Sequence, residues 1–240
     1  MTTLLISTRN AHKIGEIRSI LGASFYYWTL DDFPHAPEVV EDADTFAGNA
    51  AKKAMGLAKW VAIGQQMPPR AGSASPGPPS NNQDSFVLAD DSGLEVDALD
   101  GAPGVHSARF AALDSGRPGN SSDADNRVKL LRLLQAVPLG QRTARFRCVL
   151  ALTPMPGPSR ENASPVCYSD ELEFSTQLFE GACEGRIAIE PKGPGGFGYD
   201  SLFIPEGYKQ TFGELSSEVK NRLSHRAKAL AELRRRLVVA

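Results

Sequence analysis

A chain of 240 residues with 41% hydrophobic and 22% charged side chains has the composition of a globular protein with a sizeable core. Its formal net charge of -2 argues against a protein that binds nucleic acid over its whole surface. No signal-peptide pattern begins the chain, and no apolar run approaches the roughly 18 residues needed to cross a bilayer. Three cysteines without a CxxC spacing favour a reduced setting and argue against a zinc site. We expect a cytoplasmic protein without a membrane segment.

The first half of the chain predicts strands that alternate with helices. Apolar and β-branched residues at 3–7 and 25–30 predict two strands, and alanines at helical spacing predict a helix over 44–63. Residues 86–89 predict a buried strand, followed by an acidic turn and a second strand that starts at Leu94.

Residues 65–85 interrupt this pattern. Eleven of these 21 residues are Pro, Gly or Ser, which predicts a flexible surface insertion. Loops between a helix and a strand are usually much shorter. We expect the insertion to be unimportant for catalysis.

The second half predicts an amphipathic helix and strands that pair as hairpins. The helix covers 124–137, with Val128, Leu131 and Leu134 on its apolar face. The predicted strands lie at 143–153, 166–174, 185–191 and 197–205, and a helix with an interruption follows residue 216. The expected fold class is therefore α/β with a mixed β-sheet and flanking helices.

The polar loop 7–13 follows the first strand and is a candidate anion site. Backbone N–H groups and the helix dipole at such a loop face the ligand. Thr8 and Asn10 can donate to phosphate oxygens, and Lys13 adds a full positive charge. The alternative is that Asn10 only caps the helix and Lys13 is solvated.

Carboxylates follow the predicted strand 86–89. Asp90 and Asp91 are adjacent like charges, and Glu41 comes shortly before a helix. Such hard oxygen ligands suit Mg²⁺, which takes a few carboxylates together with water and substrate phosphate. The alternative is that Asp90 caps a turn and Asp91 is solvated.

The segment 191–203 is rich in glycine and aromatic residues. Four glycines between 193 and 198 let the backbone approach a ligand closely. Phe197 and Tyr199 offer aromatic faces for a flat base, and Asp200 is a nearby acceptor. The alternative is a glycine turn whose aromatic side chains point into the core.

The basic C-terminal region holds seven Lys or Arg residues and two Glu residues from 216 onward. Ser224 can cap a helix whose first turn carries His225 and Arg226. Cations are disfavoured at a helix N-terminus, so their placement indicates an anionic or electron-rich ligand. The alternative is a solvated basic helix.

These segments, in this order, resemble the inosine triphosphate pyrophosphatase family, which removes non-canonical purine nucleoside triphosphates. The resemblance spans nearly the whole chain. It is carried by the motifs STRNAHKIGEI, EDADTFAGNAAKKA, LADDSGLEVDALDGAPGVHSARFA, PKGPGGFGYDSLF and ELSSEVKNRLSHRAKAL.

The resemblance implies one elongated α/β domain over 1–240, with two lobes around a central active-site cleft. It also implies a homodimer that uses Mg²⁺ to hydrolyse dITP, ITP and XTP to monophosphate and pyrophosphate, which keeps these nucleotides out of DNA and RNA. Neither a nucleic acid nor a membrane is an expected partner.

The site residues follow from the motif positions. The resemblance assigns the phosphate loop to Thr8, Asn10 and Lys13, the metal to Glu41 and Asp91, and catalysis to Asp91 as base together with Lys13. Ser92 matches a substrate contact, and Asp90 is expected only to support Asp91. The base pocket is assigned to Phe197, Gly198, Tyr199, Asp200, Lys220, His225 and Arg226. One departure is Arg9, where the family usually has a small residue.

Two alternatives remain from the sequence. One is a nucleotide pyrophosphatase for other modified nucleotides. The other is a nucleic-acid-binding module that uses the basic C-terminal helix.

Overall fold

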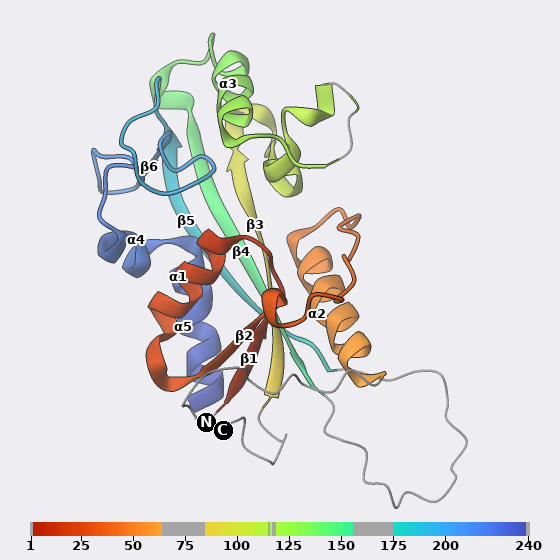
Figure 1. The fold of residues 1–240 in the computed structure, drawn as a ribbon. Helices are drawn as coiled ribbons and strands as arrows, with labels where there is room; N and C mark the ends of the chain where they lie inside the picture. Colours follow the sequence, from red (N-terminus) through yellow and green to blue (C-terminus); the bar gives the residue numbers. More distant parts are fainter. Residues whose placement is uncertain (1, 64–84, 115, 117–118, 156–174, 239–240) are drawn as a thin grey trace, which may run out of the picture. The chain divides into compact units, whose positions relative to one another are not determined.

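The computed structural model describes residues 2–63, 85–114, 116, 119–155 and 175–238 (Figure 1). The chain forms two compact units. Unit 1 consists of Met1–Asp90 and Leu150–Leu178, and unit 2 consists of Asp91–Val149 and Phe179–Ala240. The predicted flexible insertion lies outside the described residues, except for Ser85, which begins a strand.

Unit 1 begins with the predicted strand–helix–strand. These elements are β1 (Thr3–Ile6), α1 (Ala11–Leu21) and β2 (Tyr26–Thr29). β1 pairs in parallel with β2 on one side and with the start of β3 (Ser85–Val96) on the other. All four residues of β1 are buried, as expected for a parallel strand that is covered on both faces.

The helices of unit 1 supply that cover. α1 and α2 (Phe46–Ala62) lie on opposite sides of β1 and β2 (Figure 1). α2 buries Ala50, Ala54 and Leu57, which recur at helical spacing along one face. Its first turn is capped by Thr45, whose hydroxyl accepts the Gly48 N–H at 3.0 Å.

Strand β3 differs from the prediction. Instead of a strand, an acidic turn and a second strand, residues 85–96 form one strand of 12 residues. Asp90 and Asp91 are therefore inside a strand and are buried, at 1% and 7% exposure. The interpretation of Asp90 as a turn cap and Asp91 as solvated is wrong.

The remaining elements complete a mixed sheet. The strand order is β2-β1-β3-β4-β5-β6, with β5 and β6 antiparallel. The elements after β3 are α3 (Asp123–Leu133), β4 (Thr143–Pro154), β5 (Gln177–Ile187), β6 (Phe203–Pro205), α4 (Ser217–Leu223) and α5 (His225–Val238). Short 3-10 turns occupy Gly22–Ser24, Leu30–Asp32, Asp97–Leu99, Gly104–Arg109, Ala112–Asp114 and Leu139–Gln141. The α/β class and the mixed sheet are confirmed.

The predicted strands of the second half need correction. β5 covers 177–187, of which only the last three residues were expected to be strand, and the predicted strand 166–174 lies outside the described residues. Only Phe203–Pro205 of the predicted strand 197–205 is extended. Gly196 and Gly198 have positive φ angles of 74° and 60°, which form a turn there instead.

The predicted apolar face of helix α3 is correct at Leu131 and Leu134, which pack in or against the core, and wrong at Val128. Val128 is 66% exposed, whereas Leu130 and Leu134 are fully buried. Arg142 is also buried, and its guanidinium donates to the carbonyl oxygens of Leu134 at 2.8 Å and Val137 at 3.0 Å. These bonds satisfy carbonyl groups at the C-terminal end of α3 and explain why a charged residue is buried here.

Two of the three cysteines lie in the described part of the chain. Cys148 and Cys183 are free and buried, and Cys167 lies outside the described residues. Burial raises the pKa of the Cys183 thiol to about 11, so this thiol is protonated at neutral pH. Over the described part of the chain, no helix is both long and apolar enough to span a membrane.

A close approach between β5 and α5 depends on Gly181. A Cβ atom at this position would lie 2.2 Å from the His225 carbonyl oxygen and 2.6 Å from the Ala229 nitrogen. We predict that Gly181→Ala lowers the free energy of unfolding by about 1–3 kcal/mol, as overpacking of a core does. Urea denaturation of the purified variant measures this change.

A glycine in open space provides the control. A Cβ at Gly15 of α1 meets nothing within 4 Å, so Gly15→Ala should stabilise the protein by about 0.5–1 kcal/mol. Equal effects of the two substitutions would contradict the close packing of α5 on β5.

Candidate active site

The loop between β1 and α1 is held by its own side chains. Asn10 Oδ1 accepts the N–H groups of His12 at 2.9 Å and Lys13 at 3.3 Å, and the Asn10 N–H donates to Thr8 Oγ1 at 3.2 Å. Asn10 is thus the N-cap of α1, as the structural alternative predicted. Arg9 extends from this loop, and its guanidinium donates to the Ala36 carbonyl oxygen at 3.5 Å.

Lys13 is not solvated. Its ammonium group lies 2.5 Å from Asp90 Oδ1, and the lysine side chain is only 14% exposed. Asp90 therefore has a positive partner supplied by the protein. An ion pair shielded from water in this way is stronger than a surface pair, and it offsets part of the cost of burying the Asp90 charge.

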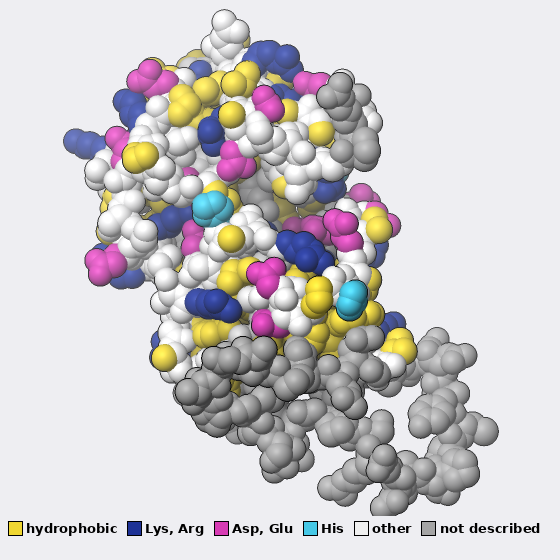
Figure 2. Space-filling model, in the orientation of Figure 1, with side chains coloured by type: hydrophobic (Ala, Val, Ile, Leu, Met, Phe, Trp, Pro, Cys, Tyr) yellow, Lys and Arg dark blue, Asp and Glu magenta, His cyan; other side chains and the backbone are white. Residues whose placement is uncertain are grey.

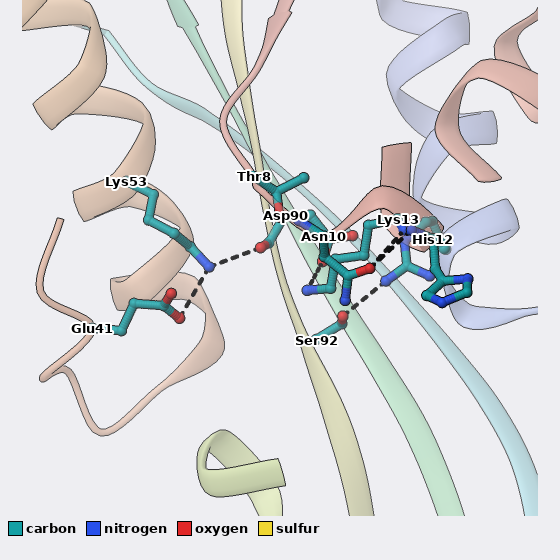
Figure 3. Close-up of polar contacts among 9 residues, drawn as sticks. Thr8, Asn10, His12, Lys13, Glu41, Lys53, Asp90 and Ser92 are labelled. Carbon is teal, nitrogen blue, oxygen red and sulfur yellow. Dashed lines mark hydrogen bonds and ion pairs between the residues drawn. The ribbon is translucent and has the colours of Figure 1, made fainter. Parts of the chain in front are cut away.

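A second lysine joins this group. Lys53 of α2 donates to Glu41 Oε2 at 3.0 Å and to the backbone carbonyl oxygen of Asp90 at 2.8 Å (Figure 3). We refer to Lys13, Glu41, Lys53 and Asp90 as the lysine–carboxylate cluster. The sequence prediction missed Lys53. The signal available in the sequence was that Lys53 directly precedes Ala54 of the apolar face of α2, and in the structure Lys53 is 12% exposed whereas Lys52 is 46% exposed.

The lysine–carboxylate cluster lies where ligands bind in α/β sheets. The register Ile6↔Leu88 ends the parallel pairing of β1 with β3, and Asp90 follows two residues later. Open α/β sheets bind their ligands outside the carboxyl ends of parallel strands, and the N-terminus of a following helix attracts anions. Unit 1 therefore presents two ammonium groups and the start of α1 at that edge.

Asp90 and Asp91 have separate surroundings. Successive side chains of a strand project from opposite faces, so Asp91 points away from the face on which Asp90 meets Lys13. Asp91 is the first residue of unit 2 and is 7% exposed. The two carboxylates, although adjacent in sequence, have different neighbours.

The glycine-rich loop 193–200 of unit 2 is built for close backbone approach. A Cβ at Gly196 would lie 2.1 Å from Asp200 Oδ2, and one at Gly193 would lie 2.2 Å from the carbonyl carbon of Gly213. Asp200 Oδ2 also accepts the Phe197 N–H at 2.8 Å. Only glycine allows the loop to fold over Asp200 in this way.

Lys220 and Asp200 form a buried ion pair under this loop. Lys220 Nζ lies 2.5 Å from Asp200 Oδ2, and the two side chains are 7% and 4% exposed. The same ammonium lies 4.8 Å from the centroid of the Phe197 ring, and the guanidinium carbon of Arg226 lies 5.9 Å from it. Two cations therefore flank an aromatic ring that remains partly exposed.

The cap of α5 places Arg226. Ser224 Oγ accepts the Ala227 N–H at 3.2 Å, so α4 and α5 are separated at the predicted interruption. Arg226 is fully buried and donates to Ser92 Oγ at 2.9 Å. Unit 2 thus gathers Ser92, Phe197, Lys220 and Arg226 from separate segments of the chain.

Two predicted base-pocket residues have their rings in the core of unit 2. Tyr199 is 3% exposed, and its hydroxyl donates to the Ser107 carbonyl oxygen at 2.9 Å. Burial raises the pKa of this hydroxyl well above its usual value, which keeps it protonated as a donor. His225 is 4% exposed and stacks on Phe146 with ring centroids 4.8 Å apart.

The candidate metal ligands are carboxylates of the type that Mg²⁺ prefers. Glu41 is partly exposed, at 38%, and lies beside Lys53, while Asp91 is buried. Within the described ranges, no three His, Cys, Asp or Glu residues gather as a ligand group. Mg²⁺ takes few protein carboxylates, because water and substrate phosphate complete its coordination. The donor chemistry of Glu41 and Asp91 fits this ion.

The buried pair under the glycine-rich loop allows a stability test. Lys220→Met leaves the Asp200 carboxylate buried without its ammonium, which should cost about 3–5 kcal/mol of unfolding free energy. Adding Asp200→Asn removes the stranded charge, so the double variant should recover most of the loss. Urea denaturation of both variants measures these changes.

The control is Lys192→Met. This side chain is 52% exposed and pairs loosely with Glu190 at 3.6 Å, so its loss should have little effect. A double variant as unstable as Lys220→Met would contradict the assignment of the cost to an unpaired Asp200.

Known proteins are similar to this chain over nearly its whole length. The Ham1 family matches residues 4–236 of the chain. A dITP/XTP pyrophosphatase of Desulforamulus reducens is 43% identical over 228 residues, covering 95% of this chain and 91% of the relative. One of Porphyromonas gingivalis is 40% identical over 240 residues, covering 100% of both chains.

Solved structures give the same result. A HAM1 protein from Coxiella burnetii aligns with a TM-score of 0.72 and 30% identity over 100% of both chains. A nucleoside-triphosphatase, or dITP/XTP pyrophosphatase, from Mycobacterium abscessus aligns with a TM-score of 0.62 and 33% identity, covering 97% of this chain and 98% of that one. These matches confirm the resemblance drawn from the sequence motifs, and the chain belongs to the Ham1 family.

Proposed function

We propose that the protein is a nucleoside-triphosphate pyrophosphatase that hydrolyses dITP, ITP and XTP to the monophosphate and pyrophosphate. The single observation that carries the proposal is the lysine–carboxylate cluster at the carboxyl edge of β1 and β3, where Lys13 pairs with Asp90 and Lys53 binds Glu41 and the Asp90 carbonyl oxygen. The names of the relatives from Desulforamulus reducens and Porphyromonas gingivalis support the substrate class.

The cluster suits a triphosphate. Lys13 and Lys53 provide two ammonium groups, and the backbone N–H groups at the start of α1 add a favourable dipole. Phosphoryl transfer is catalysed mainly by such positioning and charge stabilisation. We assign the phosphate contacts to Lys13, Thr8 and the side-chain NH2 group of Asn10, because the side-chain oxygen and the backbone N–H of Asn10 are already bound within the loop.

We assign the metal to Glu41 and Asp91 and the role of general base to Asp91. When bound, Mg²⁺ would neutralise phosphate charge and lower the pKa of a bound water. Asp91 would orient or deprotonate the attacking water, which adds to the α-phosphorus and expels pyrophosphate. The ion pair of Asp90 with Lys13 supports a different role for Asp90, which is to hold Lys13 in place.

The base is assigned to the ring of Phe197 and its two cations. Donors on Lys220 and Arg226 suit the 6-keto oxygen of hypoxanthine or xanthine. Adenine has an amino group at that position, so it would leave buried donors unpaired at a cost of about 1–3 kcal/mol each. Ser92, which accepts from Arg226, would then position that guanidinium.

The nucleic-acid alternative is less well supported. Several cations of the C-terminal region serve the fold: Lys220 and Arg226 are buried, and Lys228 donates to the Ala182 carbonyl oxygen at 2.6 Å. On the face seen in Figure 2, Lys and Arg side chains are interspersed with Asp and Glu. The mixed charge on this face lacks the electrostatic footprint that nucleic-acid binding uses.

We further propose that the whole chain acts as one catalytic domain, that it forms a homodimer and that it works in the cytoplasm. The motifs that match the family at both ends of the chain support the first point. A cytoplasmic location suits an enzyme that removes dITP and XTP before they enter DNA or RNA.

The substrate class is testable with a nucleotide panel. We expect pyrophosphate release from dITP, ITP and XTP to exceed release from dATP and dTTP by at least tenfold. An unpaired buried donor costs about 1–3 kcal/mol, and about 1.4 kcal/mol corresponds to a tenfold difference. Release should require Mg²⁺. Equal rates on dITP and dTTP would favour the broader nucleotide pyrophosphatase, and salt-sensitive DNA binding that survives Asp91→Asn would favour the nucleic-acid module.

The two aspartates should separate in a kinetic assay. Asp91→Asn should lower kcat on dITP by about 10²–10⁴-fold, the usual contribution of a general base. Asp90→Asn should cost much less in kcat and act mainly on KM, because Lys13 loses its charged partner but keeps its own charge. Circular dichroism of both variants controls for folding, and a greater loss of kcat in Asp90→Asn would reverse the assignment.

A further inference from the structure

We propose that Asp123 and Arg127 of α3 are positioning residues that fix the backbone at Gly198 and thereby orient the Phe197 ring for the purine base. The inference rests on the proposed function of the glycine-rich loop. It concerns residues that lie outside every motif used above to assign the site.

The two side chains hold both polar backbone groups of one residue. The Gly198 N–H donates to Asp123 Oδ2 at 2.6 Å, and the Gly198 carbonyl oxygen accepts from Arg127 Nη1 at 2.7 Å. Asp123 and Arg127 are four residues apart on α3, so they lie on the same face of the helix, one turn apart. We refer to these two hydrogen bonds as the grip of α3 on Gly198. It depends on two side chains on one face of the helix and not on a single contact.

Side-chain packing plays no part in holding Gly198. A Cβ at this position would meet nothing within 4 Å, although the residue has a positive φ of 60°. Glycine at such a position is free to adopt several backbone conformations. The two hydrogen bonds from α3 act on this residue together with the turn hydrogen bond from the Asp200 N–H to the Phe197 carbonyl oxygen, at 3.1 Å, which spans it.

Helix α3 is itself a rigid support. Asn126 is 3% exposed, and its side chain accepts from the Ala111 N–H at 2.8 Å and donates to the Ala108 carbonyl oxygen at 3.2 Å. At the other end of the helix, Arg142 binds the Leu134 carbonyl oxygen. The helix is anchored at Asn126, between the two residues of the grip, and again at its C-terminal end, so it can transmit a fixed position to the loop.

Phe197 lies between the fixed points of this loop. Its own N–H is bound by Asp200, and the next residue, Gly198, is bound by α3. The ring therefore has a defined place beside Lys220 and Arg226. Displacement of a binding group by about 1 Å is enough to weaken recognition, so loss of the grip should act on substrate binding.

The test compares Asp123→Ala with Asp123→Asn in the full-length protein. Asp123→Ala should raise KM for dITP about tenfold, the equivalent of one hydrogen bond to a charged group, with kcat little changed. Asp123→Asn keeps an oxygen that can accept the Gly198 N–H, so it should restore KM to within a few-fold of the original. Hydrogen exchange of the peptide that covers 193–201 should become faster only in Asp123→Ala.

Arg127→Met and Arg132→Met complete the design. Arg127→Met removes the second hydrogen bond and should also raise KM. Arg132→Met is the control on the same helix, because its guanidinium binds the exposed Asp114 at 2.9 Å and should leave KM unchanged.

Unchanged KM and unchanged exchange in Asp123→Ala and Arg127→Met would overturn the proposal, as would an equal rise of KM in Arg132→Met. If the unsubstituted protein failed to hydrolyse dITP while Asp123→Ala still accelerated exchange of the loop, the proposed function would fail but the grip of α3 on Gly198 would stand.

Discussion

The burial of charge in β3 is the constraint on which the rest of unit 1 depends. A carboxylate at 1% exposure, such as Asp90, is tolerated only beside a compensating cation. Lys13 meets this requirement from the first turns of α1, and Lys53 reaches the same backbone from α2. The two helices that cover the parallel strands thus also deliver the ammonium groups. The phosphate chemistry of the proposed function uses charges that the fold must bring together in any case.

Unit 2 also buries a charged carboxylate, Asp200, which lies beneath the glycine-rich loop. Asp200 and Lys220 neutralise one another under the loop, and the glycines let the backbone fold over that pair. The aromatic ring of Phe197 is then left partly exposed between two cations. A flat, electron-rich base suits such a place, because it can stack on the ring and accept from the cations. Backbone permissiveness and charge pairing together create the surface to which the proposed function assigns the purine base.

The sequence predicted local structure well where one signal was sufficient. The cap residue Asn10, the apolar run of β1 and the break at Ser224 each depend on near neighbours, and all three were confirmed. The sequence prediction failed at β3, because two adjacent aspartates normally mark a turn and the ion pair that reduces the cost of burying Asp90 in a strand comes from Lys13, 77 residues away. The sequence prediction also failed at Val128. Helix α3 carries apolar residues on more than one face, so helical spacing alone did not identify the buried one.

What the sequence by itself determined is the set of chemical groups: a polar loop before a helix, paired carboxylates, a glycine–aromatic segment and a basic C-terminal region. Their motifs were sufficient to indicate the family. Only the tertiary structure decided which of these groups are partners. It added Lys53 to the lysine–carboxylate cluster, turned Tyr199 and His225 into the core and placed Asp123 and Arg127 on Gly198. The physical reason is that hydrogen bonds and ion pairs depend on distances of a few ångströms between segments, and sequence spacing does not report such distances.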